Sequence, residues 1–410
     1  MSAVLSRSTG ALTRIRGWIL RGGWVMLDQA LSSLSNGLVA VFAGRTLGPE
    51  GLGEVVRILA VAYLVLAFAR AVSGEALLVY GARDAGGALS LALGVAGSVA
   101  VPSFILGMLS GVAGWTALGS VLGLVILQDW CRYVFFALRL PALACLVDAI
   151  WLAVQLALFG LLVASRAVTP GWVVLAWGLG AGAGALVGAM RLRPLSLRGA
   201  GRWFRATRSL TIGSTAQVGL SQGAAQIGIL GIGAVAGSAA LGGIRAGQVL
   251  VAPVAALLSA LFPLLLPGLR SDNGPQLRRI DRRVLVTAAI GSGLAACYGA
   301  VLLLWGGALP FLFGVDFARY ENVLGCFAVA IVFQGLAVGP GLGVRALGAG
   351  SALFATQAVA VVVGLPTTVL LAAQSGARGA ALGIAIQAGA LCAASWVSYA
   401  MSRRKAEAIS

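Results

Sequence analysis

Long apolar stretches separated by short polar segments run along the whole chain. A helix that crosses the hydrocarbon core of a bilayer needs ~20 mostly apolar residues. The chain contains about twelve stretches of this kind, so the pattern predicts an all-α integral membrane protein. We expect spans at 22–43, 53–73, 87–110, 112–136, 142–164, 169–190, 209–234, 239–266, 285–306, 322–344, 351–372 and 378–400.

The first of these spans carries a polar stripe. Asp28, Ser32 and Ser35 are spaced so that they share one helical face, and Gln29 and Asn36 lie beside them. Polar groups without partners are costly in hydrocarbon. We therefore expect the stripe to face other protein or a water-filled cavity.

A related pattern recurs in the second half of the chain. The motif Gly-x3-Gly-x3-Leu-Gly occupies Gly44–Gly53 and returns at Gly233–Gly242, an offset of 189 residues, and a polar-striped helix precedes each copy. The same offset aligns Asp28 with Gln217. Two halves that start on the same side of the membrane form a parallel repeat, as in transporters that bind substrate between their repeats.

The repeat predicts two lobes of six helices each. We expect a basic interfacial N-terminus at 1–21, an N-terminal lobe at 22–190, a basic cytoplasmic linker at 191–208, a C-terminal lobe at 209–400 and a cytoplasmic tail at 401–410.

Composition and charge agree with this topology. Residues of the charged types make up 10% of the chain, against roughly 25% in soluble domains. With the N-terminus in the cytoplasm, the inner side receives 23 of the 29 Arg and Lys residues, a bias that fits the positive-inside rule. Both termini are then cytoplasmic, and the net charge of +17 indicates anionic membrane lipids as partners, with no nucleic acid. The outer residues are Arg45, Arg57, Arg166, Arg245, Arg319 and Arg378.

Several chemistries lack the residues they need. The chain has no histidine, the commonest general base and metal ligand, and its five cysteines have no paired spacing. Lys405 is the only lysine, so there is no Walker A loop. We expect no enzyme activity, no cofactor and no metal site.

Four segments resemble one known family. The segment GRTLGPEGLGEVVRILA, residues 44–60, is similar to the junction of helices 1 and 2 in bacterial polysaccharide flippases. These Wzx-type or PST flippases belong to the multidrug/oligosaccharidyl-lipid/polysaccharide (MOP) transporter superfamily. Further similar segments are Ser73–Val79, Leu127–Tyr133 followed by Asp148, and Leu309–Phe317.

The resemblance implies a function. It implies a flippase that carries a polyprenyl-pyrophosphate-linked oligosaccharide across the bacterial inner (plasma) membrane by alternating access, for cell-surface polysaccharide biosynthesis. Polysaccharide assembly proteins are further partners that it suggests. One alternative is a cation-coupled multidrug exporter of the same superfamily, which would need acidic residues in its cavity. Another is a membrane glycosyltransferase or polymerase, which would need a sizeable outer loop and clustered catalytic groups.

Arginines are the candidate ligands of such a headgroup, because a guanidinium binds phosphate oxygens bidentately and stays charged. Arg70 and Arg132 lie toward the inner ends of their spans and are candidates for a pyrophosphate clamp. The alternative is that they are ordinary anchors that reach the lipid headgroups. Arg57, near the outer end of its span, is a candidate for headgroup release, and the alternative is a pair with Glu54.

Uncharged polar residues are the candidate ligands of the glycan. Ser32 and Asn36 in the first stripe, and Gln217 and Gln226 in the second, are able to meet sugar hydroxyls. The alternative is that they form hydrogen bonds between helices.

Two aspartates are candidates for coupling transport to an ion. Asp28 lies on the stripe, and its alternative role is capping or pairing near the inner surface. Asp148 has no neighbouring charge on its own helix, so its alternative role is to pair with Arg132 or Arg139 across the helix hairpin. Asp129 precedes Arg132 by three residues, a spacing that favours a structural ion pair.

Overall fold

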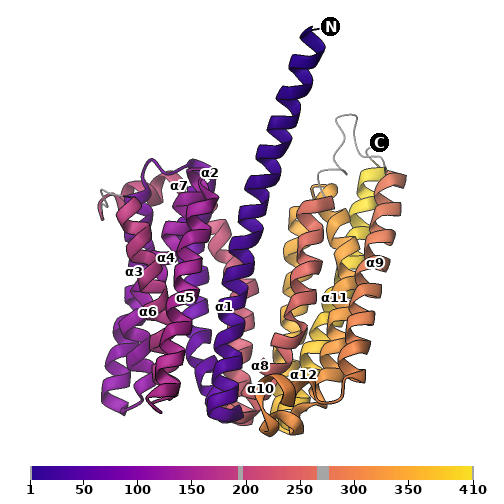
Figure 1. Ribbon diagram of the computed structural model, residues 1–410. Coiled ribbons are helices and arrows are strands. Elements are labelled where there is room, and N and C mark those ends of the chain that lie inside the picture. Colours follow the sequence, from indigo (N-terminus) through magenta and orange to yellow (C-terminus); the bar gives the residue numbers. More distant parts are fainter. Residues whose placement is uncertain (1, 193–196, 266–276, 409–410) are drawn as a thin grey trace. The chain divides into compact units, whose positions relative to one another are not determined.

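The computed structural model describes residues 2–192, 197–265 and 277–408, with side chains from residue 23 onward except those of 262–264. These residues form helices and turns, with no strand among them, so the predicted all-α fold class is confirmed (Figure 1). In this part of the chain, nine helical stretches are long and apolar enough to cross a membrane. Three of them contain a backbone break, at Gly48, Gly237 and Ser375–Gly376, that divides each into two helices. The stretches therefore correspond to the twelve predicted spans of a multi-pass membrane protein.

The first half of the chain contains five long helices, the first of them broken at Gly48. Beyond that break the chain passes through a π-helical turn, Arg70–Gly74, into the short helix α2. The helices are α1 (Ser2–Ala69), α2 (Glu75–Tyr80), α3 (Ala85–Ser110), α4 (Ala113–Ala137), α5 (Pro141–Ala164) and α6 (Pro170–Arg191).

The second half also contains five long helices among its described residues, and its π-helical turn precedes the break at Gly237. A π-helical turn, Gly219–Gly223, joins α7 to α8, and a 3₁₀ turn, Val315–Tyr320, follows the short helix α10. The helices are α7 (Ala200–Val218), α8 (Ala224–Leu265), α9 (Leu277–Leu304), α10 (Ala308–Phe313), α11 (Val323–Ala346) and α12 (Gly350–Glu407).

The start of α7 differs from the predicted seventh span, which began at residue 209. The helix begins at Ala200, inside the predicted linker 191–208. Trp203 and Thr207 lie one turn apart on its buried face, and the indole nitrogen of Trp203 donates to the carbonyl of Val72 at 3.3 Å. These contacts hold residues 200–208 in a helix, whereas the arginines of this segment favour a loop in the sequence-based prediction. Residues 193–196 of the linker and 409–410 of the tail lie outside the described residues.

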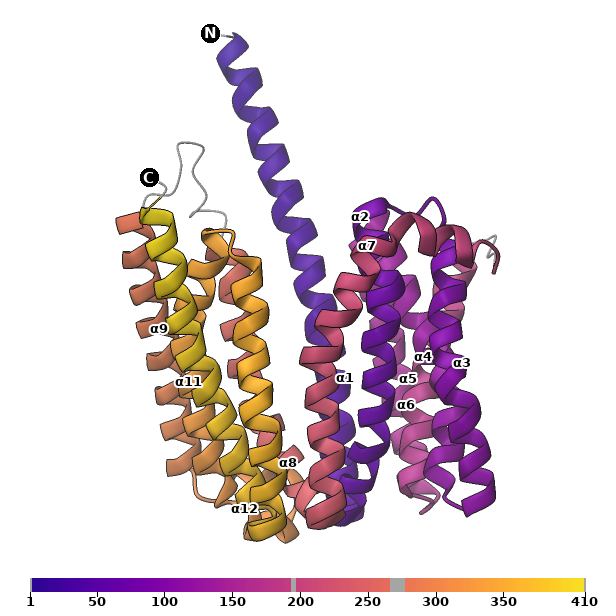
Figure 2. The same ribbon diagram turned by 180° about the vertical axis from the view of Figure 1, so that it is seen from behind.

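Two compact units make up the chain. One contains Met1–Val39 and Val61–Val218, and the other contains Ala40–Ala60 and Gly219–Ser410. In the first unit, α4 packs against α3, α5 and α6, and Figures 1 and 2 show these four helices side by side. In the second unit, α11 packs against α9 and α12. The division into lobes at 22–190 and 209–400 stays a prediction.

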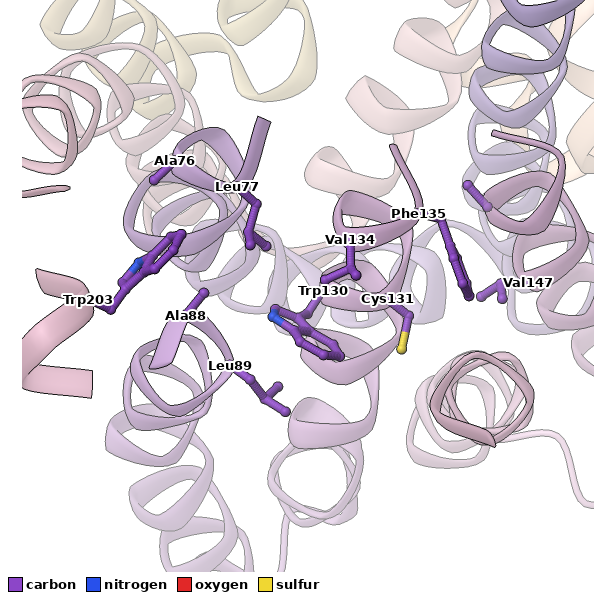
Figure 3. Close-up of a cluster of buried hydrophobic side chains, with 11 residues drawn as sticks. Ala76, Leu77, Ala88, Leu89, Trp130, Cys131, Val134, Phe135, Val147 and Trp203 are labelled. Atoms are coloured by element: carbon purple, nitrogen blue, oxygen red, sulfur yellow. The ribbon is translucent and has the colours of Figure 1, made fainter. Parts of the chain in front are cut away.

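A buried apolar cluster packs several helices of the first unit together (Figure 3). The cluster contains Trp130 and Phe135 of α4, Leu77 of α2, Leu89 of α3 and Trp203 of α7. Burial of large side chains contributes roughly 1.5–3 kcal/mol each. The cluster therefore fixes the rotation of α4 about its axis, and with it the direction of the charged residues on another face of that helix.

The backbone breaks at Gly48 and Gly237 support the internal repeat. The two residues are related by the offset of 189 that the sequence motif gives. Their conformations are alike, with φ 69° and ψ −172° at Gly48 and φ 84° and ψ 167° at Gly237. Positive φ is readily adopted only by glycine. Both halves therefore turn from one span to the next in the same way.

Candidate substrate cavity

A cavity of about 580 Å³ lies within the first unit. Side chains from α1, the π-helical turn, α2, α4 and α5 line it, together with residues of the turn between α4 and α5. The lining residues are Val25, Asp28, Gln29, Ser32, Ser33, Asn36, Tyr63, Leu66, Arg70, Leu78, Arg132, Tyr133, Phe136, Arg139, Pro141 and Trp151.

The predicted polar stripe of α1 divides between this cavity and the protein interior. Asp28, Ser32 and Asn36 recur every four residues and line the cavity. Ser35 instead faces α5, where its hydroxyl donates to Gln155 Oε1 at 2.8 Å and Gln155 Nε2 donates back to the Ser35 carbonyl at 3.2 Å. The stripe thus has one edge that holds helices together and one edge that borders an open volume.

Arg132 is the centre of a buried charge cluster. Its Nη2 lies 2.6 Å from Asp28 of α1, its Nη1 lies 3.1 Å from Asp129 of α4, and its Nε lies 3.1 Å from Asp148 of α5. The predicted pair of Asp129 and Arg132 is confirmed, as is a bond from Asp148 to Arg132. One guanidinium therefore ties three helices together, and only 6% of its side chain is exposed.

Arg70 joins the cluster through Asp129. Its Nε donates to Asp129 Oδ2 at 2.9 Å and its Nη2 donates to Asp129 Oδ1 at 2.7 Å, which is a bidentate pair. The Arg70 side chain is 35% exposed. Both predicted clamp arginines therefore border the cavity, but Arg70 offers much more of its surface to it than Arg132 does.

The cluster contains more carboxylates than guanidiniums. Two arginines, Arg70 and Arg132, face three acids, Asp28, Asp129 and Asp148. Gln128 Nε2 donates to Asp148 Oδ1 at 2.6 Å. Among the described residues, Asp148 Oδ2 and Gln128 Oε1 are buried without a hydrogen-bond partner. The same residues contain no group of three Cys, Asp or Glu side chains placed to hold a metal ion.

Aromatic residues form the wall near Asn36. The Tyr63 hydroxyl donates to Asn36 Oδ1 at 3.1 Å, and the Tyr63 ring packs edge-on against Trp177. Trp151 donates its indole hydrogen to the Trp177 carbonyl at 2.8 Å. We did not single out Tyr63 or Trp151 from the sequence. Their polar-tipped rings within aliphatic spans were the available signal.

Three predicted binding residues do not line this cavity. Arg57 belongs to the second compact unit, forms no ion pair with Glu54 in the described part of the chain, and has a buried Nε without a partner there. Gln217 is exposed on α7. Gln226 is buried on α8, where no described group bonds its Oε1. Their roles in substrate binding stay predictions.

Comparison with solved structures identifies the fold. The lipid II flippase MurJ in an inward closed conformation matches with a TM-score of 0.71 and 11% identity, over 93% of this chain and 89% of that chain. A MOP superfamily transporter from Pyrococcus furiosus matches with a TM-score of 0.60 and 13% identity, over 95% of both chains. An outward-facing multidrug resistance MATE family transporter of the same superfamily gives 0.61 and 13%, again over 95% of both chains. No family model and no curated protein matches the sequence.

The chain therefore has the fold of the MOP transporter superfamily, as the resemblance of residues 44–60 implied. The solved proteins that share this fold include flippases and efflux transporters, and they are not enzymes.

Proposed function

We propose that the protein is a flippase that translocates a polyprenyl-pyrophosphate-linked oligosaccharide across the bacterial inner membrane by alternating access. Its product would serve cell-surface polysaccharide biosynthesis. In the proposed orientation both termini are cytoplasmic, and anionic lipids contact the basic inner surface. The likeness of the fold to that of a lipid II flippase supports this class of substrate.

The observation that carries the proposal is the partly exposed side chain of Arg70 at the cavity wall. An arginine in a membrane-spanning segment is costly unless it has a partner or a function. Arg70 has a partner in Asp129, yet it keeps about a third of its side chain open to the cavity, which suits a group that also binds a ligand. Pyrophosphate is a fitting ligand because its oxygens accept bidentate hydrogen bonds.

The remaining wall suits the first sugars of such a substrate. Ser32, Asn36 and Tyr63 offer hydroxyl and amide groups to the cavity. Since the rise of a helix is ~1.5 Å per residue, the polar positions from Asp28 to Asn36 extend over roughly 12 Å. This is enough for a headgroup and one or two sugar rings.

A cation-coupled multidrug exporter is the competing function within this fold. Such an exporter would need carboxylates in its cavity that no arginine neutralises, because these attract cationic drugs. Here the carboxylates of Asp28 and Asp129 are both bonded to arginines, and the more exposed charges of the wall include those of Arg70 and Arg139. The wall therefore favours an anionic ligand over a cationic one.

Coupling to an ion is proposed at Asp148. Asp28 accepts two bonds from Arg132, at 2.6 and 3.3 Å, and both of its oxygens are engaged. Asp148 has one buried oxygen without a partner among the described residues. A proton on that oxygen would leave the remaining two carboxylates of the cluster balanced by its two guanidiniums.

Reconstitution tests this function. The purified protein is placed in liposomes that carry a fluorescent polyprenyl-pyrophosphate oligosaccharide, and a membrane-impermeant quencher measures the fraction of labelled lipid in each leaflet. Protein-dependent movement between leaflets is expected. Efflux of cationic drugs without movement of the lipid would identify a multidrug exporter and contradict the proposal.

A further inference from the structure

We infer that Asp129 is an internal competitor of the substrate, a carboxylate that occupies Arg70 until an anionic headgroup displaces it. The inference rests on the proposed function, because it concerns how the same cavity accepts and releases its ligand. It assigns Asp129 the role of a positioning residue that acts through Arg70.

The geometry of the pair is that of the expected ligand. Asp129 receives two parallel bonds, from Nε at 2.9 Å and from Nη2 at 2.7 Å of Arg70. A phosphate group engages a guanidinium through the same two-bond arrangement. Asp129 therefore uses the donors that a pyrophosphate would need, and the two anions cannot hold this edge of Arg70 at the same time.

The charge balance makes an exchange necessary. The cluster has three carboxylates and two guanidiniums, so it contains no arginine whose charge is uncompensated. An anion that binds within this cluster, rather than at the exposed Arg139 elsewhere on the wall, must take a guanidinium from a carboxylate. Arg132 is the less available of the two, because it has three carboxylate partners and is only 6% exposed. Arg70 has one carboxylate partner among the described residues, Asp129, and is 35% exposed.

Asp129 keeps a partner when it loses Arg70. Its Oδ1 lies 3.1 Å from Nη1 of Arg132, one helical turn away on α4. A buried charge left without any partner is strongly destabilising, and the contact with Arg132 avoids most of this cost. The exchange at Arg70 therefore leaves the charges of the cluster paired.

The backbone at Arg70 also differs from a regular helix. Arg70 is the first residue of the π-helical turn that ends at Gly74. Such turns occur frequently at functional sites and locally alter the direction in which side chains project.

The competition between Asp129 and the headgroup for Arg70 also gives the headgroup a way to leave, since Asp129 can recapture Arg70 as the headgroup dissociates.

Binding measurements test this inference on the full-length protein in detergent. The probe is farnesyl pyrophosphate, with farnesol as the uncharged comparison. Asp129→Asn removes the competing charge, so the variant should bind the probe about tenfold more tightly, as expected when a charge-assisted bond no longer competes. The probe should also dissociate more slowly. Arg70→Gln should lose the binding, and the double variant should behave like Arg70→Gln.

Two further variants separate this role from a structural one. Asp129→Glu keeps the charge, so it should not tighten binding, and Asp84→Asn removes an exposed partner of Arg202 outside the cavity and should bind like the wild type. Equal or weaker binding of the probe by Asp129→Asn overturns the inference while leaving the proposed function intact. Absence of Arg70-dependent binding in the wild-type protein overturns both.

A measurement on the wild-type protein avoids dependence on the folding of Asp129→Asn. In protein labelled with ¹⁵N at arginine, the probe should shift the Nε resonance of Arg70, assigned through Arg70→Gln, and leave that of Arg132 in place. An unchanged Arg70 resonance in the presence of bound probe contradicts the exchange.

Discussion

Gly53 and Gly242 occupy equivalent positions in one reciprocal contact. A methyl group added to Gly53 would collide with the carbonyl oxygen of Ser238, and one added to Gly242 would collide with the carbonyl oxygen of Pro49. The offset of 189 residues that relates the two glycines also relates Pro49 to Ser238. The two copies of the sequence motif therefore pack against each other with local two-fold pseudosymmetry inside the second compact unit.

This contact predicts that both glycines are needed for stability. Gly53→Ala and Gly242→Ala should each lower the Tm of the detergent-solubilised protein, because overpacking of this kind costs roughly 1–3 kcal/mol. Gly293→Ala in α9 is the matched control, because nothing lies within 4 Å of the methyl group it would add. An unchanged Tm in both Gly53→Ala and Gly242→Ala would contradict the contact.

Loss of Arg132 should destabilise the first unit strongly. Arg132→Ala leaves Asp28 and Asp148 buried without their cation, and breaking a buried pair in this way costs about 3–5 kcal/mol. We expect a low yield of folded protein and a clear drop in Tm. Arg202→Ala removes an exposed pair with Asp84 and should change little. Equal effects of the two substitutions would show that the buried cluster does not hold the helices together.

The two edges of the stripe on α1 should respond differently to substitution. Ser32→Ala alters the cavity wall, so it should raise the KM for lipid-linked substrate severalfold with little effect on Tm. Gln155→Ala removes the bonds to Ser35 and should lower Tm, since a buried hydrogen bond contributes about 1 kcal/mol. Thermal denaturation and transport kinetics, measured on the same preparations, check this division.

Asp148→Asn tests ion coupling. The amide keeps the shape of the side chain and its bond to Gln128 but cannot take up a proton. An imposed proton gradient should accelerate lipid movement in wild-type proteoliposomes and have no effect on the variant. A preserved response in Asp148→Asn, together with a lost response in Asp28→Asn, would transfer the coupling role to Asp28.

The span pattern could be predicted from the sequence because it depends on local composition. Limits of the predicted spans 112–136 and 142–164 lie within one residue of α4 and α5. The start of α7 was missed, because its arginines outweighed the signal of a single buried aromatic residue, Trp203. Hydropathy records how apolar a segment is and does not record which contacts hold it.

The candidate site was predictable only in part. The pair of Asp129 and Arg132 follows from their spacing on one helix. The bidentate pair of Arg70 and Asp129 could not be found in this way, because it depends on how the π-helical turn sits against α4. Sequence spacing gives neighbours within a helix, whereas contacts between helices depend on packing that only the folded chain defines.

The most direct test of the account is the movement of the labelled lipid-linked oligosaccharide in liposomes that contain Arg70→Ala. The control is Arg83→Ala, which removes an exposed arginine that does not line the cavity. The account predicts that Arg70→Ala abolishes or strongly reduces lipid movement at normal protein insertion, and that Arg83→Ala transports like the wild type. Wild-type transport by Arg70→Ala would contradict the central claim that this guanidinium binds the headgroup.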